Sequence, residues 1–167
     1  MRCFFLVCLG KYPNMKNQDT WFAEYAVSHQ NQTNQKIHYI CVPLIFWSIV
    51  GLLVSIPSEF LSNLLGTTNP YLSNWAVPAL ALAMLFYLTN LKAKNSILMF
   101  LFSAICIGSA VWLGELTNLW QISLGVFVLA WIGQFYGHKI EGVKPSFFKD
   151  LQFLLVGPAW VFEKMTR

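Results

Sequence analysis

The chain has 167 residues, of which 56% are hydrophobic, 16% aromatic and only 11% charged, and its formal net charge is +4. This balance excludes an ordinary soluble domain, in which about 25% of residues are charged. The positive charge requires no nucleic acid partner, because anionic lipid headgroups attract a basic surface.

The N-terminal residues 1–14 contain "MRCFFLVCLG", a short apolar run without the small-residue cleavage pattern of a signal peptide. We interpret 1–14 as an unstructured or mis-started extension and 15–167 as a single membrane-embedded domain. Residues 20–28 predict an amphipathic helix, because Trp21 and Tyr25 recur at helical spacing.

Two of the three histidines bound the polar run "HQNQTNQKIH" at 29–38. An unbroken helix would put His29 and His38 on opposite faces, since nine residues turn it by nine times about 100°. Asn and Thr favour turns, so the run predicts a turn that folds His29 back beside His38. As a first-turn or capping residue, Asn34 would face the same spot.

Four apolar stretches free of Lys, Arg, Asp, Glu and His follow, at 39–56, 75–91, 97–114 and 119–137. At about 1.5 Å per residue, each reaches the roughly 30 Å of a hydrocarbon core. The sequence therefore predicts an all-α polytopic membrane protein with four transmembrane helices. A shorter apolar stretch at 151–162 contains Gly157-Pro158, which would break a spanning helix, and predicts an interfacial or re-entrant C-terminal segment.

All eleven Lys and Arg lie before the first stretch, between the second and third, or after the fourth. The loops 57–74 and 115–118 have none. By the positive-inside rule, both termini face the cytoplasm. The expected location is the inner (plasma) membrane of a bacterium or the endoplasmic reticulum of a eukaryote.

The third histidine, His138, follows the fourth stretch directly and so lies on the same side as His29 and His38. Glu141 shares its face if the helix continues for one more turn. Three imidazoles and a carboxylate suit a divalent metal such as iron or zinc, with positions left open for water or substrate. The plainer interpretation is that these histidines decorate the membrane interface and that Glu141 is a solvated partner of Lys139.

The blocks "YAVSHQNQTNQKIHYICVPL" and "WIGQFYGHKIEGVKPSFFKDLQFLLVGPAW" resemble the signatures of a small membrane-protein family, formerly a domain of unknown function, whose fungal-type member is a 2-hydroxy fatty acid dioxygenase. The matching positions are His29, Asn34, His38, Gly137, His138, Glu141 and Pro145. Cys41 stands where a Gly is expected, which bears on helix packing, and Ser146 stands where the family often has Ala.

The resemblance implies an Fe(II)-dependent dioxygenase that converts a 2-hydroxy fatty acid and O₂ into CO₂ and a fatty acid one carbon shorter, a step of fatty acid α-oxidation. Four electrons leave the substrate, the number that reduces one O₂ fully. No nucleotide cofactor is then required, and the chain contains neither a GxGxxG motif nor a phosphate loop.

The resemblance also suggests roles for single residues. The iron ligands would be His29, His38 and His138. Glu141 would be a further ligand or an acceptor that fixes the tautomer of a ligating histidine, and Asn34 would hydrogen-bond the substrate carboxylate or O₂. Lys36 or Lys139 would attract the anionic head.

Two other classes of function stay open on the residues alone. A membrane zinc hydrolase of lipid amides or esters would also use three histidines and an open site. A non-enzymatic scaffold or transporter subunit would need them only at the interface. Against a transporter, the four predicted spans contain no Asp, Glu, Lys, Arg or His.

Overall fold

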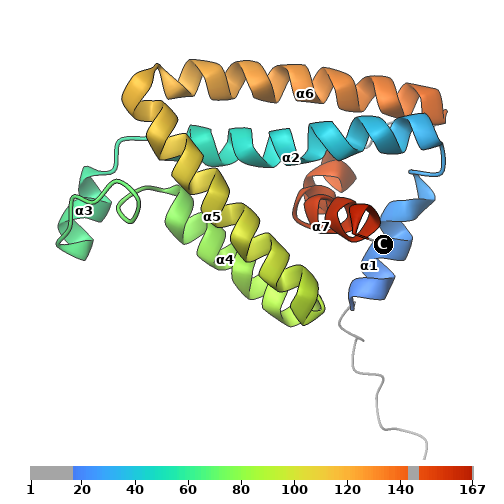
Figure 1. Cartoon of the computed structure of the whole chain (residues 1–167), viewed down its shortest axis with the longest axis horizontal. Helices are drawn as coiled ribbons and strands as arrows, with labels where there is room; N and C mark the ends of the chain where they lie inside the picture. The colour runs from blue at the N-terminus through green and yellow to red at the C-terminus, as the bar shows by residue number, and fades with distance from the viewer. Residues whose placement is uncertain (1–16, 143–146, 167) are drawn as a thin grey trace, which may run out of the picture.

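In the computed structural model of the chain, the structure describes residues 17–142 and 147–166. All regular secondary structure in these two ranges is helical (Figure 1). The helices are α1 (Gln18–Val27), α2 (Gln32–Val54), α3 (Glu59–Leu65), α4 (Ala76–Asn90), α5 (Ala93–Leu116), α6 (Leu119–Glu141) and α7 (Phe147–Met165). The all-α prediction is confirmed for the described residues, whereas the interpretation of 1–14 falls outside them.

Asparagine side chains set the start of the first two helices. Asn17 caps α1 and Asn31 caps α2, each by accepting hydrogen bonds from N–H groups of the first turn. Between these helices the chain turns over 28–31. The turn after α1 is therefore present, but it is shorter than the polar run, because "QTNQ" already belongs to the first turn of α2.

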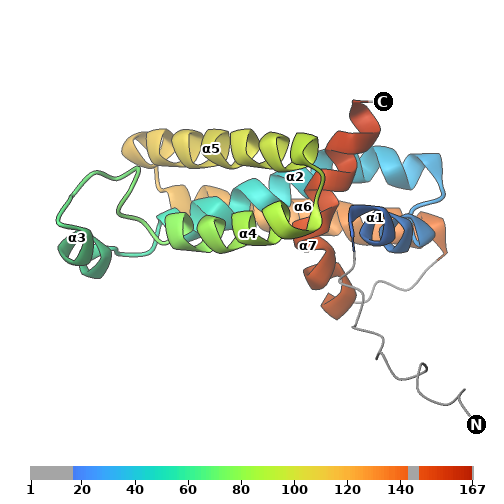
Figure 2. The same cartoon turned by 90° about the horizontal axis from the view of Figure 1, so that it is seen from below.

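The chain passes between the two ends of the molecule in α2, α4, α5 and α6 (Figures 1 and 2). One end carries α1 and the loop between α4 and α5. There the Lys92 N–H donates to Gln18 Oε1 at 2.8 Å, and the Lys92 ammonium pairs with Asp19 at 2.8 Å. The other end carries α3 and the short connection from α5 to α6.

Three helices are long and apolar enough to cross a membrane: α2, α5 and α6, with 23, 24 and 23 residues. The remaining predicted span, 75–91, forms α4, which is apolar but has only 15 residues. At 1.5 Å per residue it measures about 22 Å, short of a hydrocarbon core. By length and composition the structure thus supports a membrane protein with three spanning helices, and a fourth span stays a prediction.

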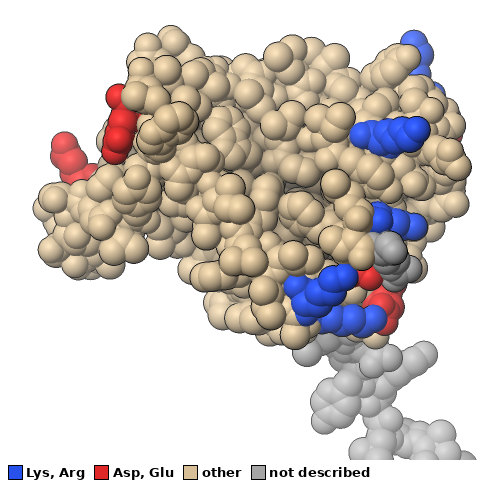
Figure 3. All heavy atoms as spheres, viewed as in Figure 1, with Lys and Arg blue, Asp and Glu red and all other residues tan. Residues whose placement is uncertain are grey.

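The described lysines gather at one end of the molecule, the end that carries α1 and α7 (Figure 3). Those whose side chains the structure describes are Lys36, Lys92, Lys94, Lys139 and Lys164. Acidic side chains lie at both ends in the same view, and at the α1 end Asp19 pairs with Lys92. The position of the lysines follows from the segments in which the sequence places its basic residues.

The most extensive helix contact joins α2 to α6, which lie antiparallel. Small residues let the two backbones approach at three levels: Gly51 beside Ser123, Cys41 beside Gly133, and Asn34 beside Gly137. A Cβ added to Gly133 would lie 2.6 Å from Cys41 Sγ. Helices in lipid associate through close backbone approach of this kind. Here it fixes the position of His38 along the helix pair relative to that of His138.

The last helix, α7, lies across the direction of α2 and α5 (Figure 2). Gly157 and Pro158 do not interrupt it, since the helix runs continuously over Phe147–Met165. Its second half is buried against α1, α2 and α5. This helix therefore covers the end of the bundle where α1 turns into α2.

Candidate metal centre

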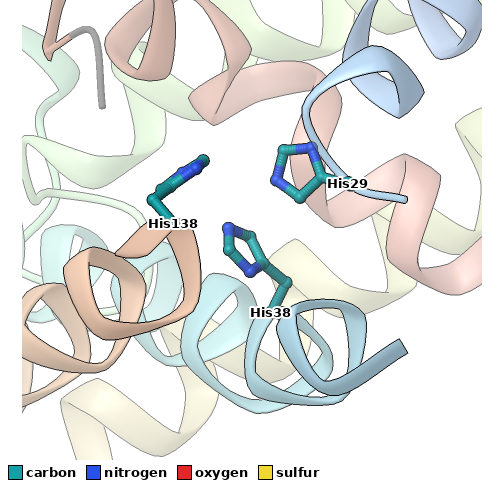
Figure 4. A group of neighbouring side chains, drawn as sticks. All are labelled: His29, His38 and His138. Carbon is teal, nitrogen blue, oxygen red and sulfur yellow. The ribbon is translucent and has the colours of Figure 1, made fainter. Parts of the chain in front are cut away.

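Three histidines from distant parts of the chain point toward one another (Figure 4). His29 lies in the turn after α1, His38 in α2 and His138 in the last turn of α6. One ligand nitrogen of each lies within 4.8 Å of the others. Nitrogens bound at about 2.1 Å to one ion are at most about 4.2 Å apart, so small side-chain rotations would bring all three into ligand distance.

Backbone carbonyls orient two of the rings. His29 Nδ1 donates to the Tyr25 carbonyl at 2.6 Å, and His38 Nδ1 donates to the Asn34 carbonyl at 2.9 Å. In both cases the carbonyl belongs to the residue four positions earlier. A ring that donates from Nδ1 keeps its lone pair on Nε2, which is then the atom available to a metal.

The donor set fits a metal ion. His29 Nε2 is buried and has no hydrogen-bond partner among the described residues. A buried polar atom without a partner is costly, and a metal ion would satisfy it. Neutral imidazoles are ligands for iron and zinc alike, so the geometry supports a metal and leaves its identity to the chemistry of the reaction.

Burial keeps His29 in the protonation state that binds metal. His29, His38 and His138 are only 2%, 1% and 4% exposed. The Tyr25 ring stacks on His29 with centroids 4.0 Å apart. Desolvation lowers the pKa of His29 from 6.5 to about 4, although the hydrogen bond to the Tyr25 carbonyl opposes the shift. At neutral pH this ring is therefore uncharged, as a metal ligand must be.

Glu141 ties the turn that carries His29 to the end of α6. Its carboxylate accepts hydrogen bonds from the Gln30 N–H at 2.7 Å, the Asn31 N–H at 2.9 Å and the Asn34 amide at 2.9 Å. Free N–H groups at a helix N-terminus attract a carboxylate in this way. Glu141 does not belong to the converging group of three, and main-chain carbonyls hold the tautomers of His29 and His38.

The side chains of the other predicted site residues are also not part of the converging group. Asn34 is buried, and its amide donates to Glu141 and to the Ser28 carbonyl, so it fastens the turn. Lys36 and Lys139 are exposed. Neither lysine lines the cavity beside the histidines. The described lining of this cavity contains no Lys or Arg.

A cavity of about 30 Å³ adjoins the three rings. Its lining consists of Tyr25, His29, His38, Val42, Ile45, Trp131, Gln134, His138, Phe153, Leu154 and Gly157. Gln134 is buried in its wall, in the same lining as His38. Gln134 is not among the site residues that the sequence predicts. The signal that could have found it is its spacing of one helical turn from His138.

Three ligands and an adjoining space make a centre with open coordination positions, the arrangement that catalytic metals need. A family model described as 2-hydroxy-palmitic acid dioxygenase Mpo1-like matches residues 15–167. No curated protein and no solved structure gives a significant match. The matched range contains all three histidines and every described helix.

Proposed function

The chain belongs to the Mpo1-like family, and from that membership we propose that it is an Fe(II)-dependent dioxygenase of 2-hydroxy fatty acids. The reaction converts R-CH(OH)-COOH and O₂ into R-COOH, CO₂ and H₂O. Atoms balance, and four electrons pass from the substrate to oxygen. The observation that carries the proposal is the meeting of three buried imidazoles at one cavity.

The iron would be held by His29, His38 and His138. When bound, it supplies O₂ activation and Lewis-acid contact to the carboxylate and hydroxyl of the substrate. The protein holds the imidazoles in place beforehand, through the carbonyls of Tyr25 and Asn34. Burial of the site under α7 excludes bulk water, which strengthens every electrostatic interaction inside.

Gln134 is the side chain placed to orient the substrate head. It lies in the cavity wall beside His38 and one turn from His138. An amide can donate to a carboxylate and accept from a hydroxyl, so it can bind both groups of a 2-hydroxy acid. With no cation in the described lining, this neutral hydrogen bond takes the role that sequence reasoning gave to Lys36 or Lys139.

The position of the centre suits an amphiphilic substrate. The histidines lie at the end of the molecule that carries the lysines, and the positive-inside rule assigns that end to the cytoplasmic face. A fatty acid in the cytoplasmic leaflet already has its carboxylate at this level and its tail in lipid. We therefore place the reaction at the cytoplasmic surface of the membrane.

The test is metal analysis of detergent-purified protein, followed by oxygen uptake with 2-hydroxypalmitate. We expect one iron per chain and one O₂ consumed for each pentadecanoate formed. Palmitate, which lacks the hydroxyl, should cause no uptake. Zinc-reconstituted protein that hydrolyses lipid amides or esters, with no oxygen consumption by the iron form, would replace this proposal with the hydrolase alternative.

A further inference from the structure

The cavity beside the histidines continues along two helices in the same direction. On α2 its lining residues are His38, Val42 and Ile45, and on α6 they are His138, Gln134 and Trp131. Both sets follow a helical spacing of four and then three residues, so each lies on one face of its helix. Because α2 and α6 are antiparallel, both series lead away from the histidines toward the middle of the molecule.

Polarity changes along this path. The histidines and Gln134 form one end, and Val42, Ile45 and Trp131 line the part that follows. Seven residues of helix span about 10 Å, so the apolar part reaches well into the membrane-crossing portion of α2. A cavity that is polar at the membrane surface and apolar below matches a fatty acid with its head at the metal.

Helix α7 forms the third wall with Phe153, Leu154 and Gly157, and of these Gly157 carries no side chain. A Cβ added there would lie 3.2 Å from Val42 Cγ1 and 3.3 Å from Tyr25 Oη. Any larger side chain would have to extend into the cavity or push α7 away from α2. Glycine at this position therefore lets α7 pack closely on Val42 and Tyr25, and a larger side chain there would be forced into the cavity that Gly157 lines.

We propose that the acyl chain of the substrate lies between α2, α6 and α7, along Val42 and Ile45, and that Gly157 is the residue that keeps this path open. The proposal rests on the proposed function for the identity of the head group. The cavity of about 30 Å³ is too small for a long acyl chain, so the tail is admitted only if the α7 wall moves outward. Phe153 and Leu154 in that wall are only partly buried, whereas Val42 and Ile45 are buried.

The first test measures binding without turnover. Palmitate and glycolate are titrated into the metal-loaded protein and into its Gly157→Leu variant. Palmitate carries the tail without the 2-hydroxyl, and glycolate carries the reacting head without a tail. We expect the variant to bind palmitate at least about tenfold more weakly, consistent with overpacking of a filled site, and to bind glycolate within twofold of the parent protein.

The matched control is Gly125→Leu on α6, where an added Cβ meets nothing within 4 Å. It should bind both ligands as the parent does. Equal palmitate affinity in the Gly157→Leu and Gly125→Leu proteins would overturn the proposal. Metal content and oxygen uptake with 2-hydroxypalmitate are measured in parallel, so that a failure of the proposed function is seen separately from a failure of the acyl path.

The second test needs no variant and holds even if Gly157→Leu does not fold. A palmitate analogue with a photoreactive diazirine in the first half of its chain is bound, irradiated and mapped by mass spectrometry. We expect labels on Val42, Ile45 or Trp131. Labels confined to exposed apolar residues such as Leu44 and Leu129 would show that the tail lies in bulk lipid and would overturn the proposal.

Discussion

At the level of single residues, the centre depends on what the second nitrogen of each imidazole does. In His29 and His38, Nδ1 donates a hydrogen bond to the main-chain carbonyl of the residue four positions earlier. These acceptors are part of the backbone, so no side-chain substitution removes them. The ligand direction of the two rings is therefore a property of the local chain path, whereas the approach of His138 depends on helix packing.

Replacing any one of His29, His38 or His138 by Ala should abolish stoichiometric metal binding and 2-hydroxypalmitate-dependent oxygen uptake. The helices should persist, because their apolar contacts do not involve the imidazoles. Metal analysis, circular dichroism and oxygen uptake check the three statements. Lys94→Ala, at an exposed lysine of the same end, is the control, and full metal content in His138→Ala would contradict the assignment.

Glu141 should raise the metal affinity indirectly, because its carboxylate holds the turn that carries His29. Glu141→Ala leaves the Gln30 and Asn31 N–H groups without their carboxylate, so His29 is held less firmly. We expect metal affinity to fall by about 10- to 100-fold, the usual effect of residues that orient ligands. Cobalt titration followed by absorption measures the change.

Glu141→Gln keeps one carbonyl acceptor and should lose less affinity than Glu141→Ala. The control is Glu59→Gln, an exposed residue of α3 at the opposite end, which should bind cobalt like the parent. Unchanged affinity in Glu141→Ala would show that the turn is held without the carboxylate.

The sequence was sufficient to select the three histidines, because each stands in a polar segment next to an apolar stretch on the same predicted side. It was insufficient for Gln134 and Tyr25. Whether a residue on α6 faces the cavity or lipid depends on the rotation of the whole helix about its axis, and that rotation is set by contacts with α2. The role of Lys36 and Lys139 stays a prediction, because both side chains are exposed and outside the cavity lining.

At the level of helices, the α2–α6 pair determines whether His138 reaches the other two rings. The pair depends on small residues that face each other across the interface, and Cys41 with Gly133 is the middle level. Here the Sγ of Cys41 occupies the space that a Cβ at position 133 would need. Cys41 therefore bears on helix packing, as the sequence predicts, through its contact with Gly133.

Gly133→Ala should destabilise the protein by about 1 to 3 kcal/mol, the usual cost of overpacking a tight contact. Removing Sγ by Cys41→Ala in the same chain should restore most of the loss, because the added methyl then has room. Unfolding in mixed detergent measures the four proteins of this double-mutant cycle. Gly125→Ala should be neutral, and additive effects of the two substitutions would contradict the contact.

Helix lengths could be predicted less well than helix positions. Hydropathy located the four apolar stretches, but α2 extends seven residues before its stretch because Asn31 caps it and Asn34 is buried against Gly137. α7 continues through Gly157 and Pro158 because its second half is buried among three other helices. Contacts with other helices thus contribute to where α2 begins and to the continuation of α7, which local helix propensity alone does not predict.

At the level of the whole molecule, the path of the chain bears on the number of spans. α4 is short, yet it leads from the α3 end to the loop that Lys92 ties to α1. An even number of crossings returns the chain to the side on which it began. The bond between Glu141 and the start of α2 likewise requires both to lie on one side of a membrane.

We therefore predict four crossings with both termini cytoplasmic. A reporter fused after Arg167 should read as cytoplasmic, and one inserted after Gly66, between α3 and α4, should read as lumenal or periplasmic. The positive-inside rule is the physical reason, since described lysines lie only at the end that carries α1 and α7. A C-terminal reporter on the far side would contradict this orientation and would move the centre to the other compartment.

The wide separation of the three histidines along the chain imposes an order on biosynthesis. His29 and His38 leave the ribosome about 100 residues before His138, a delay of roughly 5 to 20 s at ordinary rates of translation. During that interval two rings are present and the third is still to be made. The group of three imidazoles is therefore complete only after α6 has been made, and a chain truncated before His138 lacks one of the three candidate ligands.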